Sequence, residues 1–467
     1  MKINTSIPFI SVLLTAMVLL AGCSGDDIPA AEQQGNGQSG EVIVLGVKEV
    51  ATPVTRAQHT GSMDFTQLET TGFGVYGYEG TADYNSSSTA FNLFTANTPV
   101  TFVSGGTAPT TSLDIPGSWK YTETSSGLKE WDSEKKYTFF AYAPYMSAGE
   151  TGSGINTIST GNGDPTINYT VATDPAESVD LLWGVRSDDG TTNPASTNNG
   201  KPWMNVQQGD THSAVLFTFY HALCALGLHA QVMVDQANDT DDLGDLSQLG
   251  TIGSSGGCKV TLKSITITPA TTAFHQSGVL NLNNTTAHTP NWGSTSGTIA
   301  SLCLDSGLED DGEGGTRPNG HGTIATALLD PNTSDFSAAN PSNTSVMTNS
   351  SVPGITESAN SQAIIKDDNL FMLIPQAAQN YTINIEYYIT YKTTGESSFH
   401  REAKTGTATI SNLTLSAGVK YYLNLVFGLT TFKVTVDAVD WEESTTPVTI
   451  ATELGTSAGH SLAKRGK

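Results

Sequence analysis

The stretch YTINIEYYITYK at residues 381–392 carries the pattern that decides the fold class. Its β-branched and aromatic residues alternate with polar ones, which is typical of a half-buried β-strand. Comparable runs recur along the chain between Gly, Asn, Asp, Ser or Pro residues, as in KYTFFAYAPY at 136–145 and FKVTVDAVDW at 432–441. The strand–turn–helix rhythm of parallel α/β folds is missing. The sequence therefore predicts an all-β fold built of antiparallel β-sandwiches.

The domain organisation follows from chain length and from one acidic stretch. A chain of 467 residues is long enough for two or three domains of roughly 100–200 residues each. The segment NDTDDLGDL at 238–246 follows a very apolar run and marks the expected boundary. We predict an N-terminal β-sandwich domain at 41–235 and a C-terminal β-sandwich domain at 236–450. The last residues, 451–467, are expected to form a flexible tail.

The charge balance excludes one large class of partners. The chain has 45 acidic and 21 basic residues, for a net charge of −24, so it lacks the basic surface of a nucleic-acid binder. Only 14% of the residues are charged, against about 25% in ordinary globular domains. Ser, Thr, Asn and Gly replace them, above all at 147–175 and 283–362, which we interpret as long surface loops.

The N-terminus predicts secretion. Residues 1–22 combine a short basic start, an apolar stretch and small residues, which indicates a signal peptide. The junction Leu20-Ala21-Gly22-Cys23 resembles a bacterial lipobox, in which a peptidase cleaves before the cysteine and the thiol carries lipid. We expect lipid on Cys23 to anchor the protein in the cell outer membrane, with residues 23–40 as a flexible tether. The alternative is an ordinary signal peptide and an unmodified Cys23.

Motifs for catalysis and for cofactors are missing. The chain has no P-loop, HExxH or CxxC motif, and Gly-Glu-Gly-Gly at 312–315 has no helix to open. We therefore expect no enzymatic activity, no cofactor and no metal site. Two acidic clusters leave calcium open, although solvated loop charge is the simpler reading: residues 239–244, and the group Glu309, Asp310, Asp311 and Glu313. A carboxylate pair assembled by the fold would be invisible in the sequence, so a secreted hydrolase stays a further alternative.

The cysteines remaining after Cys23 do not suggest a disulfide framework, because they are three in number. Cys258 and Cys303 could form one pair if the fold places them face to face. Cys224 lies in an apolar run and is expected to be a buried thiol. Strand alternation places His221 and His229 on the face opposite Cys224, which argues against a Cys/His dyad.

The tryptophans open a second functional hypothesis. Aromatic faces can stack on sugars, although such residues more often fill a core or a domain interface. A surface lipoprotein that binds glycans and does not polymerise is therefore an alternative. The residues concerned are Trp119, Trp131, Trp183, Trp203 and Trp292.

Several motifs together resemble the fimbrillin family of Bacteroidales, the subunits of type V pili. They occur in order over about residues 23–441: the lipobox and tether, Thr55-Arg56-Ala57, Phe73 to Tyr78, Trp131 with Lys136 to Pro144, Asp180 to Gly184, Phe217 to Leu223, Phe371 to Gln376, and Val434 to Trp441. The resemblance implies two transthyretin-like β-sandwich domains in tandem. It also implies secretion as a lipoprotein and assembly with other pilus subunits, alike or different, by strand exchange. A host or bacterial surface receptor or glycan is a further partner to consider.

The resemblance also assigns residues to assembly. In family members that polymerise, an arginine-specific protease cuts after the first strand, and the matching bond here joins Arg56 to Ala57. That cut would detach the lipid together with EVIVLGVKEV at 41–50. In this strand Val42 and Val44 share one face while Ile43, Leu45 and Val47 share the other, so we expect burial on both faces. In the family's stalk subunits the strand donor is the C-terminal segment, which here has strand-like runs at 432–441 and 448–450. The alternatives are a tip subunit, which accepts a strand without donating one, and an anchor, which keeps its lipid.

Overall fold

The computed structural model describes most of the chain between residues 42 and 452. The described residues are 42–50, 63–86, 93–94, 96–104, 118–121, 129–147, 154–186, 200–207, 210, 214–232, 258–325, 328–329, 362–366, 369–392, 399–427, 432–440 and 448–452. The signal peptide, Cys23, the tether, Arg56 and Ala57 lie outside them, as does the tail beyond residue 452. The corresponding predictions therefore stay predictions.

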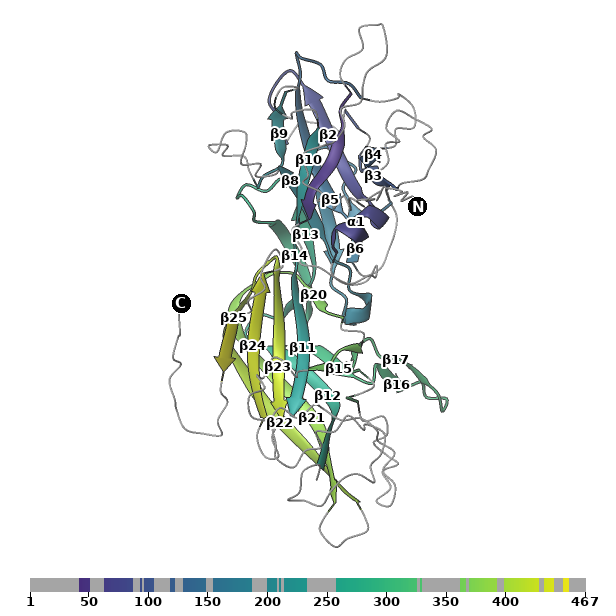
Figure 1. Cartoon of the computed structure of the whole chain (residues 1–467), viewed down its shortest axis with the longest axis vertical. Helices are drawn as coiled ribbons and strands as arrows, with labels where there is room; N and C mark the ends of the chain where they lie inside the picture. Colours follow the sequence, from purple (N-terminus) through teal and green to yellow (C-terminus); the bar gives the residue numbers. More distant parts are fainter. Residues whose placement is uncertain are drawn as a thin grey trace, which may run out of the picture. The chain divides into compact units, whose positions relative to one another are not determined.

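Strands dominate the described residues, which confirms the predicted all-β class (Figure 1). The one α-helix among them, α1 (Phe65–Thr71), starts at Asp64, whose side chain accepts a hydrogen bond from the Gln67 amide in a capping box. It ends at Gly72, where φ is 67° and an added Cβ would lie 2.5 Å from the Val100 carbonyl oxygen. No helix in the described part of the chain is long and apolar enough to cross a membrane.

The N-terminal part forms an eight-stranded sheet in the order β1-β10-β8-β5-β2-β3-β4, with β9 paired to β5. Its strands are β1 (Leu45–Val50), β2 (Phe73–Gly80), β3 (Thr98–Val103), β4 (Ser118–Tyr121), β5 (Lys136–Ala143), β8 (Leu182–Arg186), β9 (Trp203–Val206) and β10 (Val215–His221).

The central strands of this sheet are apolar on both faces because both faces are covered. In β5, Phe139 lies in one hydrophobic cluster together with Phe73 and Phe217. Its neighbour Phe140 lies in a second cluster with Tyr169. Continuous apolar runs are what a strand buried on both sides requires.

Two further sheets follow, with fewer strands than the first. A six-stranded sheet runs β19-β11-β23-β24-β25, with β20 on β11, and a five-stranded sheet runs β18-β15-β12-β21-β22. Side chains of both sheets meet in one core cluster, which includes Leu226, Ile385 and Leu423. Their strands are β11 (Cys224–Val232), β12 (Cys258–Pro269), β15 (Leu302–Asp305), β18 (Gly322–Thr323), β19 (Gln362–Ala363), β20 (Phe371–Leu373), β21 (Gln376–Lys392), β22 (Phe399–Leu415), β23 (Val419–Phe427), β24 (Phe432–Asp440) and β25 (Val448–Thr452).

The two stretches interpreted as loops contain strands, so that interpretation was wrong for the residues in those strands. Residues 148–153, 326–327 and 330–361 of these stretches lie outside the described residues. A four-stranded sheet runs β14-β13-β7-β6, and β16 pairs with β17. β14, β16 and β17 were not predicted because they are rich in exposed polar residues and lack an alternating apolar pattern. β14 is exposed along most of its length, and β16 and β17 are exposed along all of theirs. The strands are β6 (Gly154–Ile158), β7 (Thr166–Thr170), β13 (Phe274–Asn281), β14 (Asn291–Ile299), β16 (Leu308–Asp310) and β17 (Thr316–Pro318); the short helix η1 (Pro175–Glu177) follows β7.

Sheets are shared between strands from both sides of the expected domain boundary. β11 directly follows β10, yet it pairs in parallel with β23 of the six-stranded sheet. β7 pairs with β13. The bond between residues 235 and 236 lies outside the described residues, so the division into two transthyretin-like domains stays a prediction.

The open alternative of a Cys258–Cys303 disulfide does not fit the strand register. Cys303 on β15 lies opposite Thr266 of β12, eight residues along the strand from Cys258. At about 3.3 Å per residue this separates the two cysteines by about 26 Å, whereas disulfide-linked Cα atoms lie within about 7 Å. Cys303 is a free thiol.

Candidate functional site in the first-strand segment

The first-strand segment, residues 42–50, occupies an edge of the eight-stranded sheet. β1 runs parallel to β10, with Leu45 opposite Val215 and Val47 opposite Phe217. The Val215 amide donates to the Val44 carbonyl oxygen over 2.8 Å. The register slips between Val47 and Glu49, which indicates a bulge. On its other side, β1 pairs with no strand among the described residues.

The start of the segment is hydrogen-bonded to residues in and near β4, the strand at the other end of the eight-stranded sheet from β1. Val42 forms an antiparallel bridge with Glu130, and the Ile43 amide donates to the Lys129 carbonyl oxygen over 2.8 Å. The hydroxyl of Tyr121, at the end of β4, donates to the Ile43 carbonyl oxygen over 3.2 Å. The segment therefore links the β10 edge of the sheet to the β4 edge.

Two side chains of the segment are part of the core. Ile43 is 0% exposed and Leu45 is 2% exposed, and both belong to the cluster that contains Phe217. At about 1.5–3 kcal/mol for each buried aliphatic side chain, they contribute about 3–6 kcal/mol together. The predicted alternation holds for Ile43 and Leu45, which are buried, but Val47, expected on the same face, is only half-buried. The expected burial of both faces is only half met, since Val42 and Val44 are half-buried.

A small residue is required in the middle of the segment. A Cβ added to Gly46 would lie 2.8 Å from Cδ2 of Leu216 on β10. Contacts below about 3 Å between carbon atoms force one of them to move. Position 46 therefore accepts Gly, or a residue small enough for the end of Leu216 to shift aside.

Met63, the first described residue after 51–62, is anchored by a buried hydrogen bond. The Met63 amide donates over 2.9 Å to Oδ2 of Asp180, and the same carboxylate pairs with Nδ1 of His221 at 2.7 Å. The Leu181 amide donates to the other oxygen over 2.8 Å. Asp180 and His221 have fully buried side chains. The sequence placed Asp180 only within a family motif and His221 only as a buried histidine; their pairing spans 41 positions and left no local signal.

The C-terminal strands form the edge of another sheet. β24 pairs antiparallel with β23 and β25, and β25 is the last strand in the order of the six-stranded sheet. Figure 1 shows β25 outermost in the yellow group of strands. Val434 and Val436 are fully buried and Phe432 nearly so, which confirms that they share a face. Ile450 of β25 lies opposite Val436.

The described acidic cluster is a hairpin turn. Asp311 accepts hydrogen bonds from the Glu313 and Gly315 amides, each over 2.8 Å, and these bonds lower the pKa of the Asp311 carboxyl. Nε of Arg317 donates to Glu309 over 2.8 Å. No group of three or more acidic, His or Cys residues suited to a metal ion occurs among the described residues. The cluster at 239–244 lies outside them.

The tryptophans pack inside the protein. Trp119, Trp131, Trp183 and Trp203 are buried, and the half-buried Trp292 donates from Nε1 to the Ala222 carbonyl oxygen over 2.8 Å. Their faces are therefore not the sugar platforms of the glycan hypothesis. A separate cavity of about 420 Å³ lies beside Tyr84, Lys136 and Asn205.

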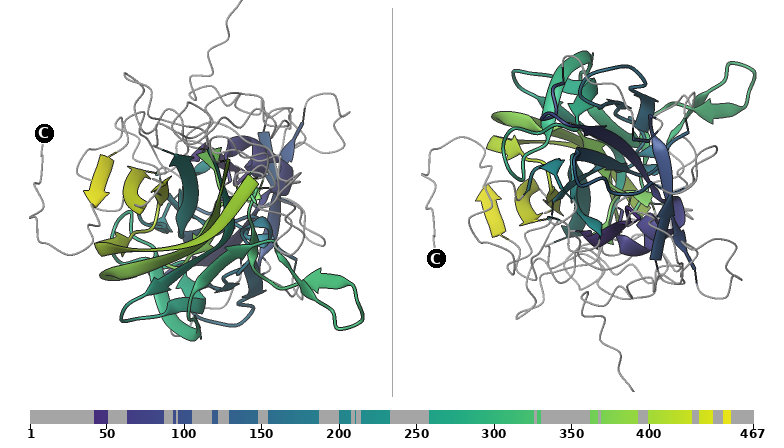
Figure 2. Two further views of the ribbon diagram at one scale, coloured as in Figure 1. Left: turned by 90° about the horizontal axis from the view of Figure 1, so that it is seen from below. Right: turned by 90° about the horizontal axis from the view of Figure 1, so that it is seen from above.

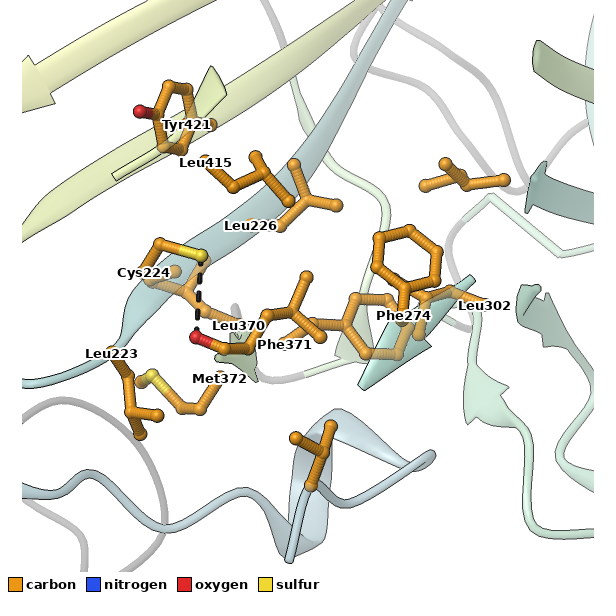
Figure 3. Packing of buried hydrophobic residues seen from close by; sticks show 14 of the residues in the cluster. Leu223, Cys224, Leu226, Phe274, Leu302, Leu370, Phe371, Met372, Leu415 and Tyr421 are labelled. Carbon is orange, nitrogen blue, oxygen red and sulfur yellow. Dashed lines mark hydrogen bonds between the residues drawn. The ribbon is translucent and has the colours of Figure 1, made fainter. Parts of the chain in front are cut away.

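Cys224 is a core residue, as predicted. Its thiol points at the Leu373 carbonyl oxygen over 3.4 Å and is surrounded by Leu226, Phe371 and other apolar side chains (Figure 3). Burial raises the pKa of the thiol to about 12. His229 lies beside the ring of Tyr422, with the ring centroids 4.9 Å apart and the planes tilted by 32°.

Comparisons with known proteins point in one direction. The chain is 23% identical over 439 residues to the protein named Fimbrium subunit Fim1C of Phocaeicola vulgatus, covering 91% of this chain and 94% of that protein. The crystal structure of a fimbrial protein from Bacteroides vulgatus ATCC 8482 has the same fold, with a TM-score of 0.55 and 20% identity over 85% of this chain and 99% of that one. No protein-family model matches. Both likenesses agree with the resemblance predicted from the sequence.

Proposed function

We propose that this fimbrillin-like chain is a structural and adhesive subunit of a cell-surface type V pilus, exported as a lipoprotein and assembled by strand exchange. A fimbrial role at the cell surface is supported by the relative named as a fimbrium subunit and by the shared fold. Lipid on Cys23 would hold the precursor in the outer membrane, and a cut between Arg56 and Ala57 would release it. The observation that carries the mechanism is the position of the first-strand segment.

Removing this segment would leave a matching vacancy. The β10 edge would lose its backbone partner, and the core around Phe217 would lose Ile43 and Leu45. Unpaired strand edges and exposed apolar surface are a template for another strand. Each backbone hydrogen bond restored by an incoming strand contributes about 1 kcal/mol net. Met63 would stay fastened to Asp180, since neither residue belongs to the removed segment.

The C-terminal strand has the right pattern to fill the vacancy. Residues 43–47 read Ile-Val-Leu-Gly-Val, and β25 at 448–452 reads Val-Thr-Ile-Ala-Thr. Val448 and Ile450 would take the places of Ile43 and Leu45. Ala451 would take the place of Gly46, where its Cβ requires only the end of the Leu216 side chain to shift. β25 is an edge strand that pairs with β24 alone among the described residues, so its departure would break the hydrogen bonds of one strand pair.

The register can be tested with one added side chain. The proposal predicts ladders of oligomers on unboiled gels of cells that carry the parent chain, and Ala451→Phe should abolish them, because the ring would collide with Leu216 of the next subunit. Thr449→Phe adds the same ring on the same face but two residues earlier, at the place of half-buried Val44 and away from the position opposite Leu216, and should keep the ladders. Ladders of normal length with Ala451→Phe would refute the register. Ladders after deletion of 446–467 would refute donation by this segment.

Processing is tested on protein taken from the cell surface. The proposal predicts a mature chain that begins at Ala57, because a cut between Arg56 and Ala57 removes the first-strand segment. A lipidated chain that begins at Cys23 would contradict the proposal and favour an anchor or a non-polymerising lipoprotein. Mass spectrometry with N-terminal sequencing distinguishes the two.

The second candidate is a surface lipoprotein that binds glycans, and the cavity beside Tyr84 is the observation in its favour. The cavity is lined by polar groups that include Asp83, Lys136 and Asn205, which suit a neutral sugar better than an apolar ligand. Saturable binding on a glycan array that is lost in Tyr84→Ala would support this candidate. Binding that survives this substitution would place the sugar elsewhere.

A further inference from the structure

Arginine is scarce in this chain. The five arginines are Arg56, Arg186, Arg317, Arg401 and Arg465. Arg56 and Arg465 lie outside the described residues. The other three belong to strands, and each has a different feature that opposes cleavage after it.

Arg186 is held through both backbone edges. As the last residue of β8 it pairs with Phe217 of β10. Its amide donates to the Lys201 carbonyl oxygen over 2.8 Å, and its own carbonyl oxygen accepts from the Gly200 amide over 3.2 Å. The guanidinium lies 4.6 Å from the centre of the Trp203 ring. A protease that binds its substrate as an extended strand must first break these pairings.

Arg401 is held mainly through its side chain. It lies within β22 opposite Thr390 of β21, and its guanidinium carbon is 3.6 Å from the centre of the Tyr388 ring. A guanidinium packed on an aromatic face is stabilised by the ring's negative face. The specificity pocket of an arginine-directed protease would have to compete for it.

Arg317 is the accessible one. Its side chain is 64% exposed, and it lies on β17 of a hairpin whose strand residues are all exposed. In Figure 2 this green hairpin stands clear of the neighbouring strands. The following residue is Pro318. Proline has no backbone N–H and restricts the residue before it, so the Arg317–Pro318 bond is a poor protease substrate.

We propose that the fold protects its described arginines from arginine-directed endopeptidases, so that such an enzyme trims the chain without dividing its body. Arg186 and Arg401 are protected by pairing and by aromatic packing, and Arg317 by the proline that follows it. The inference rests on the proposed function only for the biological use of such cleavage after Arg56. The protection is a property of the folded chain.

The test is limited proteolysis of the purified, uncut full chain with an arginine-specific endopeptidase, read by intact mass. The folded parent should yield a stable product that still contains residues 57–465. Pro318→Ala should add a cut after Arg317 and split this product into 57–317 and 318–465. The double variant Arg317→Gln with Pro318→Ala should lose that cut again. Circular dichroism confirms that each variant is folded.

Two results would overturn the inference. One is cleavage of the folded parent after Arg186 or Arg401 as fast as at any other arginine. The other is a folded Pro318→Ala variant that is not cut after Arg317. The outcome at Arg56 is read separately. If Arg56 and the internal arginines all stay intact, the result counts against the proposed processing and supports the protection. If the chain is cut after Arg56 and also after Arg186 or Arg401, the result supports the processing and counts against the protection.

Discussion

Truncating Leu45 should loosen the first-strand segment from the sheet without removing any backbone hydrogen bond. Leu45 is 2% exposed and belongs to the apolar cluster around Phe217. Leu45→Ala removes three carbon atoms, which costs about 2.4 kcal/mol at about 0.8 kcal/mol per carbon, before any cavity is counted. With a cavity the cost rises to about 3 kcal/mol, within the range of about 2–5 kcal/mol for such changes. The detached state of the segment should therefore become about 100-fold more populated.

Hydrogen–deuterium exchange of the uncut chain measures this population directly. Exchange of the paired amides requires local opening, so their protection should fall by about two orders of magnitude at 43–47 and 215–219. Peptides from β21, which is not hydrogen-bonded to β1 or β10, should keep the parent's protection.

Val47→Ala is the matched control because Val47 is only half-buried against the same cluster. It removes two carbons that are partly solvated already, so protection should fall by less than about tenfold. If Leu45→Ala changes protection by less than about fivefold, equivalent to about 1 kcal/mol, Leu45 does not hold the segment in place and the reasoning is refuted.

Three other predictions concern groups away from β1. Asp180→Ala removes the acceptor that His221 and the Met63 amide share in the core, so the free energy of unfolding should fall by about 3–5 kcal/mol. An unchanged Tm would contradict this expectation. The control Asp83→Ala removes an exposed ion pair and should lower the free energy of unfolding by at most about 1 kcal/mol. Partial burial acts to raise the pKa of Asp305, but hydrogen bonds from His321, Asn319 and Gly307 outweigh it and lower that pKa. A lowered pKa stabilises the fold above the ordinary value of 3.8, and this stabilisation is lost as pH falls through the folded value, so amide exchange at 307–319 should accelerate below about pH 4; acceleration beginning near neutral pH would implicate a different group. The Cys224 thiol, with its pKa raised to about 12, should resist iodoacetamide at about pH 8 in the native chain, whereas half-buried Cys303 should react first; equal rates would contradict the burial of Cys224.

The sequence predicted the features that depend on local alternation. The all-β class, the facing of Ile43 and Leu45, and the buried positions of Phe432, Val434 and Val436 all follow from period-two patterns. Where apolar residues do not alternate, the same rule fails. β14 consists mostly of Gly, Ser and Thr, and most of its side chains are exposed, so nothing in its composition distinguished it from a loop.

Pairings between distant segments could not be predicted from the sequence. The parallel partnership of β1 with β10 joins residues about 170 positions apart, and no local pattern records it. The apolar run at 214–234 indicated burial. It did not indicate that its first half, β10, and its second half, β11, belong to different sheets. Asp180 and His221 lie 41 positions apart, so only the fold brings these two side chains together.

The direct passage of β10 into β11 has a mechanical consequence. Only Ala222 and Leu223 separate two strands that belong to different sheets, and each strand has a parallel neighbour, β1 for β10 and β23 for β11. Tension applied along these strands would load their backbone hydrogen bonds together in shear, whereas a pull across the strands would open them one at a time. The covalent backbone would carry the load from one sheet to the next without an intervening flexible loop.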